Sequence, residues 1–166
     1  MPSLARFGFI SFAVIFAGLA LMTVLAPAKS TEFGLQIERR IAGRQVQGTE
    51  ADGCRMPYLV GGNGETLVLL HGISANKDNF TRVAQHLTPE FHVVIPDLPG
   101  FGNASAPPDA DYSLSAQVSR IAAFLDALDL DRVHLGGSSM GGYIAAAFAA
   151  EYPDRVASLW LLAPAG

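Results

Sequence analysis

The stretch Gly137-Ser138-Ser139-Met140-Gly141 decides the fold of this chain. It follows an apolar run, Val133 to Gly136, of the kind that forms a buried strand. It opens an alanine-rich run, Tyr143 to Ala150, that favours a helix. Strand, tight turn and helix, in that order, are the context in which a G-x-S-x-G sequence carries its serine on a sharp, strained turn. We therefore expect Ser139 at the tip of such a turn, clear of a buried sheet.

The residue types of this turn suit a nucleophile at Ser139. Side chains at Gly137 and Gly141 would collide with the strand and the helix on either side of the serine. Because the helix begins at the serine, backbone N–H groups and the positive end of the helix dipole point at the reacting oxygen. The alternative is a glycine-rich turn with an ordinary serine, and the surrounding sequence favours the nucleophile.

A second motif, His71-Gly72-Ile73, ends the apolar run Leu67 to Leu70. With it, the chain resembles the α/β-hydrolase superfamily, and within that superfamily the membrane-anchored monoacylglycerol lipase and esterase branch. Four blocks carry the resemblance and occur in the family's order: His71 to Phe80, Pro96 to Gly102, Gly137 to Gly142, and Leu159 to Gly166.

The resemblance implies roles for the residues around Ser139. Ester hydrolysis passes through a tetrahedral oxyanion, which two backbone N–H groups stabilise. The amide of Met140, directly after the nucleophile, is one expected donor, and by resemblance Ile73 supplies the other. Gly72 lets its loop approach the reacting centre closely. In the resembled family the position of His71 is structural and holds this loop, so we do not expect it to act as the base.

Another acid, Asp97, stands at the end of a predicted strand, where a catalytic carboxylate could lie. The Pro-Asp-x-Pro-Gly block of the resembled family assigns it hydrogen bonding within the loop instead. The other histidines, His86, His92 and His134, belong to no motif, and we expect ordinary surface or strand positions for them.

The composition excludes several classes of protein. The chain has 166 residues, 50% of them hydrophobic and 16% charged, which is enough for one domain with a core. Its net charge of −4 and the lack of a basic stripe argue against a nucleic-acid partner. Its single cysteine, Cys54, excludes an internal disulfide, and no cysteine–histidine cluster has metal-binding spacing. We therefore expect no metal and no cofactor.

The N-terminal segment is apolar enough to cross a membrane. Phe7 to Ala26 contains no charge, and a helix of that length spans about 30 Å. We expect residues 1–28 to be a single-pass membrane anchor, as in the resembled branch. The alternative is a signal peptide cleaved at Ala26-Pro27-Ala28, which would give a secreted or periplasmic protein. Residues 29–48 are then a juxtamembrane linker, either a short helix near the headgroups or a solvated segment.

Residues 49–166 are expected to be the N-terminal portion of an α/β-hydrolase domain. Asp52-Gly53 signals the turn of an antiparallel hairpin over Thr49 to Val60. Apolar runs predict buried strands over 67–70, 91–95, 133–136 and 156–162, and 3–4 periodicity predicts helices over 79–87 and 114–128, the second with Ser113 as N-cap. Alternating strands and helices imply an α/β fold, a mostly parallel sheet with helices on both faces.

One departure from the family's pattern concerns the catalytic triad. The triad order in this fold is Ser, then Asp or Glu, then His. After Ser139 the chain has two acids, Glu151 and Asp154, and no histidine. Both acids lie at the far end of the predicted helix, roughly 15 Å from the serine, and cannot orient a base there. We therefore expect the chain to be the N-terminal part of a longer enzyme, without its lid, catalytic acid and catalytic histidine.

The leading prediction for function is a serine hydrolase of carboxylic esters. It acts through an acyl-enzyme on small-molecule or lipid esters, with monoacylglycerols as one candidate. A second interpretation is an enzyme of the same fold that hydrolyses carbon–carbon bonds or acts as a perhydrolase. A third is a membrane-tethered module without catalytic activity.

Overall fold

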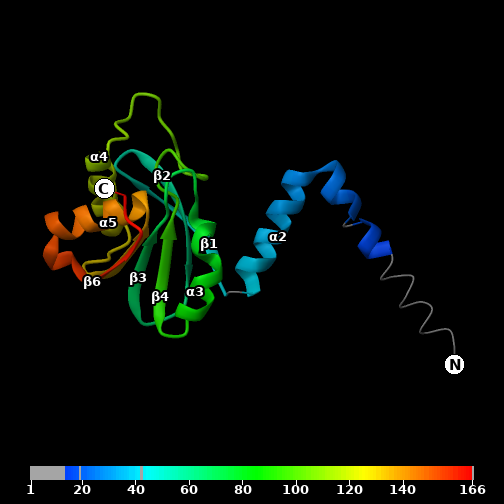
Figure 1. Cartoon of the computed structure of the whole chain (residues 1–166), viewed down its shortest axis with the longest axis horizontal. Coiled ribbons are helices and arrows are strands. Elements are labelled where there is room, and N and C mark those ends of the chain that lie inside the picture. The colour runs from blue at the N-terminus through cyan, green and yellow to red at the C-terminus, as the bar shows by residue number, and fades with distance from the viewer. Residues whose placement is uncertain (1–13, 19, 42, 166) are drawn as a thin grey trace. The chain divides into compact units, whose positions relative to one another are not determined.

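The computed structural model describes residues 14–18, 20–41 and 43–165. Contacts divide the chain into two compact units, one that ends at Glu38 and one that begins at Arg39. The N-terminal segment is helical where it is described, at 14–18, at 20–25 and in α2 (Pro27–Ile41) (Figure 1).

The predicted membrane anchor, Phe7 to Ala26, falls in part on residues 1–13 and 19, which lie outside the described residues. Within the described ranges, no helix is both long enough and apolar enough to cross a membrane. Most of the predicted linker over 29–48 is helical in α2. Its last residues, from Gln45 onward, already belong to the first strand.

The second unit is built on a six-stranded sheet with the order β1-β2-β4-β3-β5-β6 (Figure 1). The strands are β1 (Gln45–Ala51), β2 (Cys54–Gly61), β3 (Glu65–Leu70), β4 (Phe91–Pro96), β5 (Val133–Ser138) and β6 (Val156–Leu162). β2 pairs antiparallel with β1 and with β4, and the pairs β3–β4, β3–β5 and β5–β6 are parallel. The prediction of a mostly parallel sheet is confirmed.

The predicted hairpin joins β1 to β2, with Ala51 opposite Cys54. Asp52 and Gly53 between them have φ values of 47° and 70°. A two-residue type I′ turn requires positive φ at both of its central residues, which explains the Asp-Gly pair. The hairpin begins at Gln45, earlier than the predicted Thr49, because β1 continues to pair along the full length of β2.

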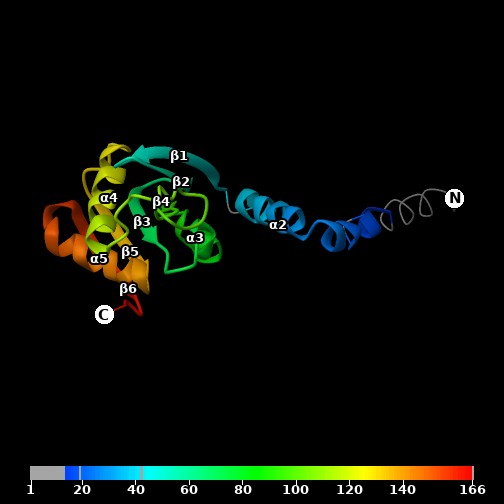
Figure 2. The ribbon, with the colours of Figure 1, turned by 90° about the horizontal axis from the view of Figure 1, so that it is seen from above.

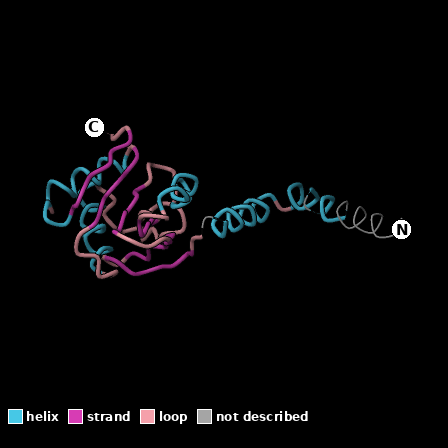
Figure 3. The backbone as a smooth tube through the Cα atoms, turned by 90° about the horizontal axis from the view of Figure 1, so that it is seen from below, coloured by secondary structure: helices cyan, strands magenta, loops and turns pink. Residues whose placement is uncertain are grey.

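Helices cover both faces of the sheet, as predicted. They are η1 (Lys77–Phe80), α3 (Thr81–Leu87), α4 (Leu114–Asp126), α5 (Met140–Glu151) and η2 (Pro153–Arg155). Successive side chains of a strand point to opposite faces, so Leu67 and Leu69 pack with η1 and α3, while Val68 and Leu70 pack with α4 and α5. Figure 2 shows α3 on one side of the strands and α4 with α5 on the other, and Figure 3 shows the strands between the helices.

The first residues of α4 and α5 can be compared with the sequence signals for helix starts. α5 follows the turn that carries Ser139, which is called the elbow below. The Ser113 hydroxyl accepts a hydrogen bond from the Ala116 amide at 3.2 Å, which confirms the predicted N-cap of α4. α5 begins at Met140, directly after Ser139, as the turn pattern predicted. Glycines at 141 and 142 lower the local helix propensity, and tertiary contacts impose the helix there in spite of it.

Candidate active site

Ser139 occupies the turn between β5 and α5 with φ 52° and ψ −119°. A residue other than glycine rarely adopts positive φ, and such strain persists only where surrounding contacts hold it. Here the Ser139 amide donates to the Leu162 carbonyl at 3.0 Å, and its carbonyl accepts from the amides of Tyr143 and Ala165, both at 3.0 Å. The Ser139 side chain makes no capping bond to α5, so its hydroxyl is not committed to the helix.

The glycines beside Ser139 bring three backbone segments into contact. A Cβ atom at Gly137 would overlap the carbonyl of Gly141. A Cβ atom at Gly141 would overlap the carbonyl of Leu70, at the end of β3. No side chain fits at either position, and the elbow is therefore packed directly on the strand that leads to His71.

The loop after β3 folds against Ser139. A Cβ atom on Gly72 would lie 3.3 Å from the Ser139 Cβ and 3.9 Å from its Oγ. The loop forms a tight turn in which the Ala75 amide donates to the Gly72 carbonyl at 3.2 Å, with Ser74 at φ 59°. Ile73 is the other central residue of this turn, and among the described residues its amide has no hydrogen-bond partner.

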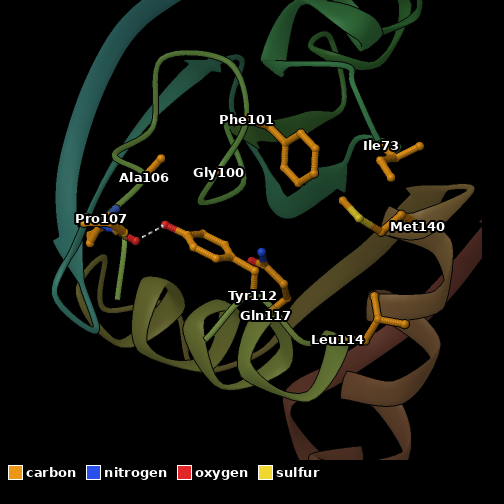
Figure 4. Close-up of a pocket in the computed structure, with 10 residues that line it drawn as sticks. Ile73, Gly100, Phe101, Ala106, Pro107, Tyr112, Leu114, Gln117 and Met140 are labelled. Atoms are coloured by element: carbon orange, nitrogen blue, oxygen red, sulfur yellow. Dashed lines mark hydrogen bonds between the residues drawn. The ribbon is translucent and has the colours of Figure 1, made fainter. Parts of the chain in front are cut away.

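Met140 and Ile73 lie at one cavity beside the serine. Met140 is the first residue of α5, where backbone amides have no partner within the helix. The two side chains line the same cavity and lie next to each other in Figure 4. The structure thus brings two unengaged amides, those of Ile73 and Met140, to the neighbourhood of Ser139.

His71 is fully buried, and both of its ring nitrogens are engaged. Its Nε2 accepts a hydrogen bond from the Leu98 amide at 3.0 Å, so Nδ1 carries the proton and donates to the Gly72 carbonyl at 2.8 Å. Burial lowers the pKa of His71 below its usual value, which keeps the ring neutral. The Phe101 ring packs edge-to-face against it at 5.9 Å between centroids. In this state the imidazole has no free nitrogen to receive a proton from Ser139.

Asp97 is buried in the loop that follows β4, and both oxygens of its carboxylate accept hydrogen bonds. The Lys77 amide donates to Oδ1 at 2.7 Å, and the Asn103 amide donates to Oδ2 at 2.8 Å. The Lys77 ammonium group also binds Oδ2, at 2.8 Å, and forms a buried ion pair with it. The carboxylate therefore organises loops, and none of its partners is Ser139.

A cavity of about 500 Å³ opens beside the two amides (Figure 4). Its walls are mostly apolar and come from the loops after β3 and β4 and from the ends of two helices: Ile73, Gly100, Phe101, Ala106, Pro107, Pro108, Tyr112, Leu114, Gln117 and Met140. The Tyr112 hydroxyl donates to the Pro107 carbonyl at 2.8 Å, and its ring lies against Gly100. Gln117 adds a second polar side chain to this wall, and its Nε2 donates to the Pro99 carbonyl at 3.0 Å.

The remaining candidates lie away from the serine. Glu151 is the last residue of α5, which begins beside Ser139, so the two are separated by the length of the helix. The described partners of His86, His92 and His134 are Gln85, Thr66, Ser158 and Glu65. Among the residues that the structure describes, no histidine is bonded to Ser139.

Sequence reasoning missed two features of this site. Lys77 is only 2% exposed, whereas lysine is expected at the surface, and no periodicity in the sequence marks it as buried. Tyr112 packs against Gly100 in the cavity wall, a contact that the sequence motifs did not predict. The Pro99-Gly100 pair is the turn signal that the sequence offered, and the structure places Gly100 at φ 88°.

Comparison with known families and sequences gives a consistent result. The family described as "alpha/beta hydrolase fold" matches residues 65–165. Lipase 1 of Psychrobacter immobilis is 46% identical over 141 residues, which cover 82% of this chain and 44% of that lipase. A monoacylglycerol lipase of Homo sapiens is 37% identical over 133 residues, which cover 77% of this chain and 40% of that protein. The chain spans about half the length of the curated relatives it matches.

Solved structures extend the similarity to the fold. One described as a membrane phospholipase A is 40% identical with a TM-score of 0.83, and the match covers 98% of this chain and 53% of that one. A putative lipase from Acinetobacter baumannii is 38% identical with a TM-score of 0.79, and the match covers 81% of this chain and 46% of that one.

Proposed function

The chain belongs to the α/β-hydrolase fold family, and on that basis we propose that it carries the nucleophile of a serine hydrolase of lipid carboxylic esters. One observation carries the proposal. Ser139 is held at positive φ on the strand–helix turn, with its side chain beside a loop whose Ile73 amide is unengaged. Strain of this kind, combined with free donors, suits a nucleophile and the oxyanion it creates.

The proposed reaction proceeds through an acyl-enzyme. Ser139 Oγ bonds to the ester carbonyl carbon as its proton passes to a base, and the carbonyl oxygen becomes an oxyanion. The amides of Ile73 and Met140 donate to that oxyanion, a contribution of about 3–4 kcal/mol for one such donor. The alcohol then leaves with a proton, and water releases the fatty acid by the same steps. Because both ring nitrogens of His71 are engaged, His71 is not that base.

The cavity supports a lipid acyl chain as the substrate group. Its volume of about 500 Å³ falls within the range of small-molecule sites, and apolar walls favour an aliphatic chain through burial of apolar surface. Relatives named as lipases and monoacylglycerol lipases, and a similar structure described as a phospholipase A, support the same substrate class. We propose monoacylglycerols and related lipid esters.

Covalent labelling tests the nucleophile. The full product of the gene that encodes this chain is treated with a fluorescent fluorophosphonate, which reacts with activated serines. Labelling is expected in the native protein and in Ser138→Ala, and it is expected to be lost in Ser139→Ala. Labelling that survives Ser139→Ala would refute the assignment. Release of fatty acid from a monoacylglycerol by the same three proteins tests the substrate class.

We also propose that Phe7 to Ala26 is an uncleaved, single-pass membrane anchor. Its length and lack of charge support a span, and the similar structure described as a membrane phospholipase A matches 98% of this chain. The alternative is secretion after cleavage at Ala26-Pro27-Ala28. Mass spectrometry of membrane-extracted protein is expected to find the peptide from Ala26 to Lys29 intact, whereas a mature N-terminus at Lys29 would establish cleavage.

A further inference from the structure

A buried ion pair lies behind the loop that carries the Ile73 amide. Lys77 is 2% exposed and Asp97 is 0% exposed, and the Lys77 Nζ lies 2.8 Å from Asp97 Oδ2. The same Nζ donates to Asn103 Oδ1 at 2.8 Å. The pair therefore connects the start of η1 to two points of the loop that follows β4.

The loop after β4 wraps tightly around this carboxylate. Gly102 has φ 57°, and a Cβ atom there would overlap the Asp97 side chain. The Asn103 amide donates to Asp97 Oδ2 at 2.8 Å, directly after that glycine. The same loop supplies Gly100 and Phe101 to the wall of the cavity.

Two tethers hold the turn of Ile73 to this neighbouring loop. Before the turn, the His71 ring joins the Gly72 carbonyl to the Leu98 amide. After the turn, Lys77 binds Asp97 through both its amide and its ammonium group. The segment between the tethers has one internal hydrogen bond, from the Ala75 amide to the Gly72 carbonyl. Its position relative to Ser139 therefore depends on where the tethers place its ends.

Stability gives little reason to bury these charges. The free energy lost when two ions are moved out of water offsets much of the free energy gained from their attraction. Proteins in which apolar side chains of similar size replace such a pair are often equally stable or more stable. What a buried, fully bonded pair does supply is a defined geometry. Neither Lys77 nor Asp97 lines the cavity, and none of their described hydrogen bonds is to Ser139, so their effect on the site passes through the loops they join.

We propose that Lys77 and Asp97 are positioning residues that set the Ile73 amide for oxyanion stabilisation and hold the Phe101 wall of the acyl cavity. This inference rests on the proposed ester hydrolysis at Ser139. The pair exchanges no proton with the substrate. Its effect appears in the transition state, where the amide must meet the oxyanion at hydrogen-bonding distance.

Three variants of the full gene product test the proposal. Lys77→Met removes the cation and keeps a long apolar stem. Lys77→Met/Asp97→Asn removes both charges, so no unpaired ion remains buried. Asn103 is exposed, and Asn103→Ala removes one hydrogen-bond partner of the Lys77 ammonium group. This variant still tests the proposal if Lys77→Met does not fold.

The readouts are the thermal midpoint, kcat and KM for a short-chain p-nitrophenyl ester, and inhibition by a trifluoromethyl ketone, whose adduct with a serine carries an oxyanion. The double variant is expected to recover most of the midpoint lost in Lys77→Met, while kcat stays at least tenfold below the native value and KM changes less than twofold. Inhibition by the ketone is expected to weaken by the same factor as kcat. Asn103→Ala is expected to lower kcat about threefold with an unchanged midpoint.

Recovery of kcat together with the midpoint in the double variant would overturn the proposal, because the pair would then serve stability alone. A loss of kcat without weaker ketone inhibition would also overturn it, because the effect would not act through the oxyanion. Turnover that depends on Ser139 but is unchanged in Lys77→Met and Asn103→Ala defeats this inference and leaves the proposed function standing. Turnover that survives Ser139→Ala defeats both.

Discussion

The backbone of Gly72 is in van der Waals contact with Ser139, since a Cβ atom on Gly72 would lie 3.3 Å from the Ser139 Cβ. That distance is shorter than an ordinary contact, so one methyl group would push the loop and the serine apart by a few tenths of an ångström. The loop that carries the Ile73 amide and the turn that carries Ser139 therefore pack tightly against each other.

The Gly72→Ala variant is therefore expected to lose activity more than stability. The small displacement lengthens the Ile73 hydrogen bond to the oxyanion, and we expect kcat of the full gene product to fall about tenfold or more. The free energy of unfolding should change by about 1 kcal/mol or less. Ester hydrolysis and urea denaturation measure the two effects. Gly48→Ala, in β1, is the matched control, because its added methyl group meets nothing closer than 3.9 Å.

Gly141→Ala is expected to prevent stable folding. Its Cβ would overlap the carbonyl groups of Leu70 and His71, which are backbone atoms and cannot turn aside as a flexible side chain can. We expect a loss of about 4 kcal/mol or more in the free energy of unfolding, which is exceptional for a single methyl group. Chemical denaturation of Gly141→Ala beside Gly48→Ala measures it. Equal midpoints for the two variants would contradict the packing of the elbow on β3.

Leu114→Trp is expected to change chain-length preference. Leu114 lines the cavity at the start of α4, and the larger indole would occupy part of the space proposed for the acyl chain. We expect kcat/KM for long-chain p-nitrophenyl esters to fall about tenfold, with short-chain esters changed less than twofold. Leu128→Trp, beyond the end of α4 and outside the cavity lining, is the control. Equal losses for all chain lengths would place the acyl chain elsewhere.

His71 should make stability depend on pH. Burial lowers the pKa of His71 in the folded state below the unfolded value of about 6.5. Below pH 6.5 the unfolded chain therefore binds a proton that the folded protein does not, and stability falls as pH falls through this window, by up to about 1.4 kcal/mol per pH unit. Urea denaturation between pH 7.5 and 5 measures this slope.

The His71→Asn variant separates this effect from other titrations. It should be less stable than the native protein at pH 7.5, because the bond from the Leu98 amide is lost. Its slope below pH 6.5 should be shallower. His86→Asn, on the exposed side of α3, should keep the native slope. Parallel slopes for native protein and His71→Asn would show that His71 takes up protons equally in both states.

Residues 1–166 expressed alone are expected to show no efficient esterase turnover. A serine hydroxyl is a weak nucleophile without an adjacent base, and the His71 ring has no free nitrogen to serve as one. At the edge of the sheet, Leu159, Trp160 and Leu161 of β6 are 37% to 40% exposed, which also favours aggregation. Turnover of a short-chain p-nitrophenyl ester is compared with the Ser139→Ala form. Serine-dependent turnover near one per second would mean that a base lies within these residues.

Much of the fold could be predicted because its signals are local. The hairpin followed from the adjacent pair Asp52-Gly53, and the cap of α4 followed from Ser113 and the apolar spacing behind it. The elbow was recognisable because glycine, serine and glycine stand within five residues between a strand and a helix. In each case the residues that determine the backbone conformation are neighbours in sequence, so a local sequence pattern is enough to predict that conformation.

Helix propensity by itself would give a different start for α5. Composition alone favours a helix only from Tyr143, because Gly141 and Gly142 disfavour one, whereas the turn pattern places the start of α5 at the serine. The structure starts it at Met140, since the two glycines are needed for contact with Leu70 and Pro164. Helix propensity describes a residue by itself, whereas the contact belongs to strands and loops elsewhere in the chain.

The sequence by itself determined the α/β fold, the place of Ser139 on its turn and the family to which the chain belongs. Only the tertiary structure decided that His71 is bonded at both nitrogens, that Lys77 is buried against Asp97, and that Tyr112 packs against Gly100 in the wall of a cavity. The partners in these contacts lie up to 27 residues apart. Burial and pairing at that range follow from which strands become neighbours in the sheet, and no local pattern of residues contains that information.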